Sequence, residues 1–136
     1  MAAFVLTEFV EQTRLVTWCQ AMEAQYPELG AIFHIPNGSK AHVSYRVKLK
    51  QLGLQSGVPD LCLPCPRGPY HGLYIEMKRL QGSSTSKDQK EWHVLLQRYG
   101  YAVGVAKGWV MGSAIITDYL NLPTFQYQAR KAKGHQ

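Results

Sequence analysis

The tetrapeptides GVPD (57–60) and IEMK (75–78) contain residue types that could act on a phosphate ester. Residues 40–79 include seven Lys or Arg residues but only two acids, Asp60 and Glu76. A hard cation such as Mg²⁺ takes oxygen ligands and keeps several waters, so two carboxylates and a phosphate oxygen would suit it. Two acids in a basic field therefore predict a metal site that faces a polyanion.

The segment LYIEMKR (73–79) alternates as a β-strand does, because successive side chains of a strand point to opposite faces. Glu76 and Lys78 should lie side by side on one face. An ammonium at this place could hold or activate a water that attacks phosphorus. The alternative is a solvated Glu–Lys pair on a strand, preceded by an ordinary Pro-Asp turn.

A hairpin is predicted to bring the two acids together. A short strand follows Asp60, and the loop PCPRGPYHG joins it to the strand that carries Glu76, as expected for an antiparallel pair. Arg67 in this loop is a candidate phosphate contact, although a loop Arg is often only solvated. Cys62 and Cys65 form a C-x-x-C motif, but no second Cys pair or H-x₃₋₅-H follows, which disfavours a zinc or redox site.

The first predicted helix offers a third carboxylate. Thr7 is a plausible N-cap, and residues 8–25 form a helical pattern that Pro27 ends. Glu11 aligns with the apolar face of this helix, so it could point at the edge of the core, where a catalytic centre could use it. Glu8, one turn earlier on the same face, is the rival candidate, and a first-turn acid can also simply favour the helix dipole.

The remaining pattern predicts an α/β chain with basic residues near its centre. Further elements are expected as a strand at 31–35, helices at 42–52, 87–99 and 112–120, and a buried strand at 101–106. Trp92, Leu95, Leu96 and Tyr99 are expected to form the core face of the helix at 87–99. The candidate nucleic-acid contacts are Lys40, Arg46, Lys48, Lys50, Arg67 and Arg79. Ser86 and Gln89 match a capping box, which by itself gives Gln89 a structural role.

Composition indicates one globular domain. The chain has 136 residues, 46% hydrophobic content and a net charge of +6. We expect one domain at 1–123, followed by a flexible basic tail at 124–136. The sequence has no apolar run near the roughly 18 residues of a membrane span and no secretory signal at its start. The expectation is a soluble, intracellular protein that does not contact a membrane.

Five motifs together closely resemble the VRR-NUC domain, the virus-type replication-repair nuclease of the PD-(D/E)xK phosphodiesterase superfamily. They are HIPNG (34–38), GVPDL (57–61), PRGPYHGLYIEMKR (66–79), S-x-x-Q (86–89) and GYAVGVAKGW (100–109). The resemblance covers roughly residues 7–120, with all motifs in order. It implies a restriction-endonuclease-like α/β core with a central mixed sheet flanked by helices.

The resemblance also implies roles for individual residues. Asp60 and Glu76 would bind Mg²⁺ or Mn²⁺ together with the main-chain carbonyl of Met77. Lys78 would position the attacking water and stabilise developing negative charge. Gln89 would reach toward this centre, and Glu11 would supply the acid of the first helix, a position that Glu8 fits nearly as well.

The expected function is a metal-dependent, structure-specific DNA endonuclease that hydrolyses phosphodiester bonds. Small proteins of this type resemble resolvases, which favours a four-way (Holliday) junction as substrate and a homodimer that carries two active sites. The alternatives are a less selective flap, nick or single-strand nuclease and a non-catalytic nucleic-acid-binding module. Intact Asp60, Glu76 and Lys78 argue against a pure binder, because acids do not help to bind phosphates. A viral or mobile-element origin would place the protein in a bacterial cytoplasm.

Overall fold

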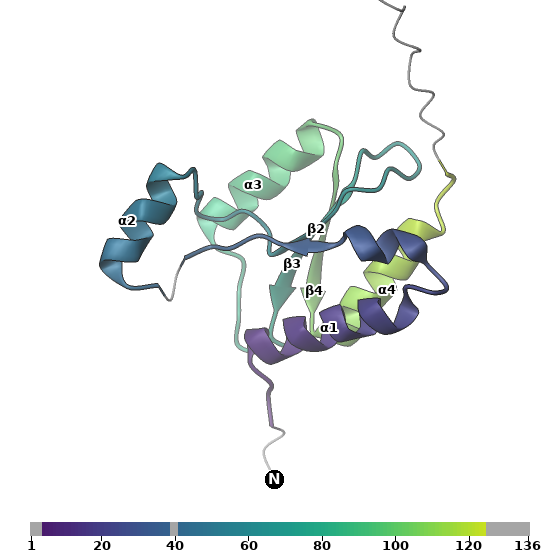
Figure 1. Cartoon of the computed structure of the whole chain (residues 1–136), viewed down its shortest axis with the longest axis horizontal. Coiled ribbons are helices and arrows are strands. Elements are labelled where there is room, and N and C mark those ends of the chain that lie inside the picture. Colours follow the sequence, from purple (N-terminus) through teal and green to yellow (C-terminus); the bar gives the residue numbers. More distant parts are fainter. Residues whose placement is uncertain (1–3, 39–40, 125–136) are drawn as a thin grey trace, which may run out of the picture.

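A four-stranded mixed sheet with helices on both faces forms the body of the protein (Figure 1). The computed structural model describes residues 4–38 and 41–124. The helices are α1 (Glu8–Met22), the 3₁₀ helix η1 (Pro27–Ala31), α2 (Val43–Gln51), α3 (Lys87–Arg98) and α4 (Trp109–Leu120). The strands are β1 (Phe33–His34), β2 (Leu61–Leu63), β3 (Leu73–Lys78) and β4 (Ala102–Lys107). The predicted α/β architecture is confirmed.

The predicted hairpin lies at the centre of the sheet. The strand order is β1-β2-β3-β4, with β1 and β3 both antiparallel to β2, and β4 parallel to β3. Leu61 pairs with Ile75, so β2 begins opposite the middle of β3. The last part of β3 therefore has β4 on one side and no β2 residue on the other.

The core fills the face of the sheet that α1 and α4 cover. Leu73, Ile75 and Met77 are all buried, as the alternation predicted, and they belong to one apolar cluster with Leu15 of α1 and Ile116 of α4. Helix α3 packs against β4 and lies across the sheet from α1 and α4 (Figure 1). Both faces of β3 are consequently covered, and even its polar side chains are shielded from water.

Local signals determine where two helices begin. The Thr7 hydroxyl accepts a hydrogen bond from Val10 N, which confirms the predicted cap of α1. Helix α4 begins at Trp109, three residues before the predicted start at 112. Gly108 has φ +84°, a left-handed conformation that lets the chain turn directly from β4 into the helix.

Several predicted boundaries were wrong. Helix α1 ends at Met22 instead of 25, because the chain enters the tighter η1 at Pro27. The strand expected at 31–35 has only two residues, and both are exposed. Tyr99 is 61% exposed and is not part of the core. Strand β4 is half-buried for most of its length because it forms an edge of the sheet.

Helix α2 stands apart from the sheet (Figure 1). None of its residues is buried, and it packs against no other helix or strand of the described chain. Its nearest support is a loop, where an added Cβ on Gly38 would lie 3.3 Å from Leu49. No helix among the described residues is long and apolar enough to cross a membrane.

Candidate active site

Asp60 is held in place at the edge of the sheet. Its carboxylate Oδ2 accepts a hydrogen bond of 2.7 Å from the main-chain N–H of Met77, and the residue is only 4% exposed. Because β2 starts one residue later, this side chain takes the place of a strand partner for the last part of β3. The hairpin thus brings Asp60 beside the strand that carries Glu76, as predicted.

The turn before Asp60 packs against the start of α3. Gly57 has φ +91°, and a Cβ at this position would lie 2.6 Å from the main-chain carbonyl carbon of Asp88. Only glycine allows this approach. The turn is therefore fixed between α3 and β2, which limits where the Asp60 carboxylate can lie.

Glu76 is the most enclosed acid of the site. It is 2% exposed, and its Oε1 accepts a hydrogen bond of 2.7 Å from Gln89 Nε2. Its Oε2 has no hydrogen-bond partner among the described residues. Burial, and then the negative charge of Asp60, raises the pKa of Glu76 to about 8. Burial also raises the pKa of Asp60, although the Met77 N–H opposes this shift. These surroundings therefore disfavour two adjacent negative charges, and a proton or a cation would relieve the repulsion between them.

Lys78 lies beside Glu76 on the same face of β3, as the alternation predicted. Its Nζ is 3.7 Å from Glu76 Oε1 and donates a hydrogen bond of 2.9 Å to Gln89 Oε1. The residue is only 6% exposed. A solvated surface pair would leave both side chains in water, so the alternative drawn from the sequence does not describe this arrangement.

Gln89 has the structural role and the site contact at the same time. Its side-chain Oε1 accepts a hydrogen bond from Ser86 N at 2.8 Å, and its main-chain N–H donates to Ser86 Oγ at 3.2 Å. These two bonds complete the predicted capping box. The same amide bridges Lys78 and Glu76. The start of α3 thus fixes the relative positions of an ammonium and a carboxylate.

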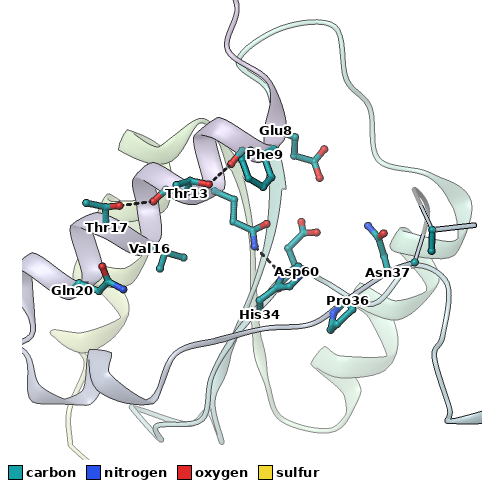
Figure 2. Close-up of a pocket in the computed structure, with 13 residues that line it drawn as sticks. Glu8, Phe9, Thr13, Val16, Thr17, Gln20, His34, Pro36, Asn37 and Asp60 are labelled. Carbon is teal, nitrogen blue, oxygen red and sulfur yellow. Dashed lines mark hydrogen bonds between the residues drawn. The ribbon is translucent and has the colours of Figure 1, made fainter. Parts of the chain in front are cut away.

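The two acids of α1 lie in different environments. Glu11 is 1% exposed, and its Oε1 accepts from Trp109 N at 3.4 Å, so it caps the start of α4. Gly108, the N-cap of α4, supplies no side-chain cap. Glu8 instead lines a groove together with Asp60 (Figure 2), and its charge contributes to the raised pKa of Glu76. Glu8 therefore shares the groove with Asp60, whereas Glu11 contacts the start of α4 through Oε1 and has a buried Oε2 without a hydrogen-bond partner among the described residues.

The predicted basic contacts lie in three different settings. Arg46, Lys48 and Lys50 are exposed on α2, and Arg79 is exposed after β3, where its Nη2 donates to Gly82 O at 2.9 Å. Lys40 lies outside the described residues.

Arg67 is buried in the protein. It is 8% exposed, its Nη2 forms an ion pair of 2.9 Å with Glu28, and its Nε donates to the carbonyl of Leu120. These contacts tie the hairpin loop to η1 and to the end of α4. We therefore assign Arg67 to the fold and do not include it among the proposed phosphate contacts.

Two histidines near the acids were missed. His93 Nε2 lies 4.0 Å from Glu76 Oε2, buried and without a hydrogen-bond partner among the described residues. Burial, and then the positive charge of Lys78, lowers the pKa of His93. Its spacing of four residues from Gln89 was the available signal, since i and i+4 share a helix face. His34 Nδ1 lies 3.0 Å from the main-chain oxygen of Asp60.

The donor set fits a hard divalent cation. A positive charge would favour the ionised form of Asp60 and Glu76. It could also be bound by Glu76 Oε2, which has no hydrogen-bond partner among the described residues. No group of three or more His, Cys, Asp or Glu side chains that could hold a metal occurs in the described part of the chain. Asp60 and Glu76 would need a main-chain carbonyl, such as that of Met77, together with water or phosphate oxygens. Mg²⁺ and Mn²⁺ are commonly bound by oxygen ligands of these kinds.

Comparisons with known proteins identify the family of the chain. The model of the VRR-NUC domain matches residues 5–109, a range that contains Asp60, Glu76, Lys78 and Gln89. A solved structure named "VRR_NUC domain protein" is 33% identical, with a TM-score of 0.75, over 90% of this chain and 95% of that one. No curated protein matches the chain. The chain belongs to the VRR-NUC family of nuclease-type domains and has its restriction-endonuclease-like fold.

Proposed function

We propose that this protein is an Mg²⁺- or Mn²⁺-dependent DNA endonuclease that hydrolyses phosphodiester bonds in branched DNA. The observation that carries the proposal is the buried cluster in which Gln89 bridges Lys78 and Glu76 beside Asp60. Burying two acids and an ammonium is unfavourable for stability unless they are paired, so such clusters are candidates for function.

Asp60 and Glu76 would hold the cation. When bound, the cation supplies Lewis-acid stabilisation of the phosphate and makes a water more nucleophilic. Lys78 has three N–H donors, one of which is directed to Gln89 Oε1, so the others remain for an attacking water or a phosphate oxygen. Gln89 orients this ammonium, and Glu8, in the groove with Asp60, is our candidate for the acid of the first helix.

The exposed cations of α2 and Arg79 are the proposed contacts to the DNA backbone. Clustered Lys and Arg residues bind phosphates by releasing counterions, without reading sequence. Helix α2 contributes Arg46, Lys48 and Lys50 and contains no acid. Substituting all three with Gln should weaken DNA binding and reduce its dependence on salt concentration.

We further propose a homodimer that cuts a four-way junction at two symmetric positions. A two-fold dimer places two identical sites around one junction, which a single small domain cannot do. Light scattering at working concentrations tests the dimer, and a monomer would remove the symmetric mechanism. A nuclease for flaps, nicks or single strands would instead cut those DNAs as fast as the junction.

The central experiment compares cleavage of labelled four-way junctions, flaps, nicked duplexes and single strands with Mg²⁺, with Mn²⁺ and with EDTA. Asp60→Asn and Lys78→Met should abolish cleavage, while the exposed controls Asp118→Asn and Lys87→Met should not. Cleavage by folded Lys78→Met at the wild-type rate would refute the assigned site. DNA binding without cleavage at any metal concentration would indicate a non-catalytic binding module.

A further inference from the structure

A groove runs from Asp60 along the side of α1 (Figure 2). Its volume is about 800 Å³, within the range of small-molecule sites. One wall is α1, and the other is the segment from β1 toward α2. Glu8 and Asp60 lie at its acidic end. The groove is therefore continuous with the proposed catalytic centre.

The part of the groove lining that the structure describes is poor in cations. Away from the two acids, the described lining consists of His34 and neutral residues, with no Lys or Arg. The hydroxyls of Thr13 and Thr17 donate to main-chain carbonyls one turn earlier, at 2.8 and 2.9 Å, so their oxygens remain as acceptors. These groups suit the amino groups of a base or the hydroxyl of a sugar better than a phosphate.

Phe9 provides an aromatic surface in the groove. It follows Glu8 on α1, lines the groove and is 74% exposed. An exposed aromatic ring in a groove offers a face on which an unpaired base can stack. A base inside a duplex is already stacked on both sides and cannot use this face unless it is displaced.

We propose that the groove holds an unpaired nucleotide next to the phosphate that is cut, with its base stacked on Phe9. This inference rests on the proposed nuclease function and adds that a nucleotide beside the cleaved phosphate leaves its base stack, which at a four-way junction requires that it be displaced from its pair. The basic residues of α2 bind the backbone, and the groove of α1 binds the base.

The test measures binding without cleavage. Asp60→Asn protein in EDTA is titrated into DNA that carries 2-aminopurine, whose fluorescence falls when it stacks. The base is placed at the first unpaired position of a flap or at the same position of a fully paired nicked duplex. We expect quenching and tighter binding only with the flap.

The variant Phe9→Ala should abolish the quenching and weaken flap binding about 5-fold or more, with less than a twofold change for the paired duplex. Phe9→Trp keeps an aromatic face and should retain both effects. Phe4→Ala is the matched control, since Phe4 is 89% exposed on the same segment and does not line the groove. Wild-type melting temperatures are expected for all three variants.

Equal effects of Phe9→Ala and Phe4→Ala would overturn the inference, as would equal quenching with the flap and the paired duplex. The outcome is separable from that of the nuclease proposal. If wild-type protein cuts DNA but Phe9 has no specific effect on binding, the groove assignment fails alone. If Phe9-dependent stacking occurs but no DNA is cut with Mg²⁺ or Mn²⁺, the nuclease proposal fails alone.

Discussion

Replacing Glu76 by Gln should make the metal-free protein more stable at alkaline pH. The Glu76 carboxyl is surrounded by Asp60 before β2, Lys78 on β3, Gln89 and His93 on α3, and the charge of Glu8 on α1. Gln keeps an oxygen that can accept from Gln89 Nε2. It removes the charge that burial and Asp60 disfavour.

The magnitude follows from the raised pKa of Glu76. Its pKa is about 8 in the folded protein against an ordinary value of 4.5. Between these values the folded state binds a proton that the unfolded state lacks, so stability falls as pH rises through this window. Each unit corresponds to about 1.4 kcal/mol, which gives an upper limit of about 5 kcal/mol between pH 4.5 and pH 8.

The assay is urea denaturation in EDTA at pH 5, 6.5, 8 and 9. The free energy of unfolding of Glu76→Gln minus that of wild type should grow by about 3 to 4 kcal/mol from pH 5 to pH 9. Because the pKa of His93 is lowered, both proteins also lose stability as pH falls below about 6.5. This loss is common to both proteins, so it cancels when their free energies of unfolding are subtracted. Glu91→Gln, at an exposed position on α3, should behave as wild type at every pH.

A divalent cation provides the second arm of this test. Mg²⁺ or Mn²⁺ should stabilise wild type most at alkaline pH, where the carboxylates must otherwise ionise side by side, and should stabilise Glu76→Gln much less. A constant difference between the two proteins from pH 5 to pH 9 in EDTA would refute the argument. It would mean that Glu76 ionises normally and that the pair does not share a proton.

Four other substitutions separate structural from functional contacts. Gln89→Met should lower the free energy of unfolding in urea by about 1 to 3 kcal/mol, because it removes the side-chain bond of the capping box and a charged hydrogen bond. Cleavage should be lost even under conditions where the variant is fully folded. Glu8→Gln should weaken Mn²⁺ binding in calorimetry more than Glu11→Gln does, whereas Glu11→Gln should lower the melting temperature more, because the Glu11 carboxylate caps α4; equal effects of the two would contradict the assignment. Arg67→Met should destabilise the fold by about 1 to 3 kcal/mol, because Glu28 loses its partner, while DNA affinity of the folded variant stays at the wild-type level.

The centre of the site could be predicted from sequence because each contact depends on a short-range rule. Strand alternation places Glu76 and Lys78 on one face, and a hairpin connection brings Asp60 to the neighbouring strand. The capping box positions Gln89 at the first turn of α3, whereas its reach toward the site was implied only by the family resemblance. These rules involve residues within one element or in two directly connected ones, so they need no knowledge of how distant layers pack.

The errors arose where packing between distant elements decides the outcome. Arg67 lies in a polar, glycine-rich loop, a setting typical of solvated side chains, yet Glu28 from η1 closes over it. The basic composition of residues 40–79 is real, but one of its cations stabilises the interior. Charge counts along a sequence cannot distinguish a surface Arg from one that a distant acid has paired.

The two acids of α1 show the same limit most directly. Glu8 and Glu11 are three residues apart, about 60° around the helix axis, so one face can contain both and periodicity cannot choose between them. The choice depends on how α1 packs in the fold: which end of α1 lies near Asp60, and which of its residues contacts the start of α4. Glu11 meets the start of α4, where Gly108 leaves the first N–H groups without a side-chain cap, and Glu8 is thereby the acid left to face the groove. The turn at Gly108 therefore accounts for the position of Glu11, while the role of Glu8 in the candidate active site stays a prediction.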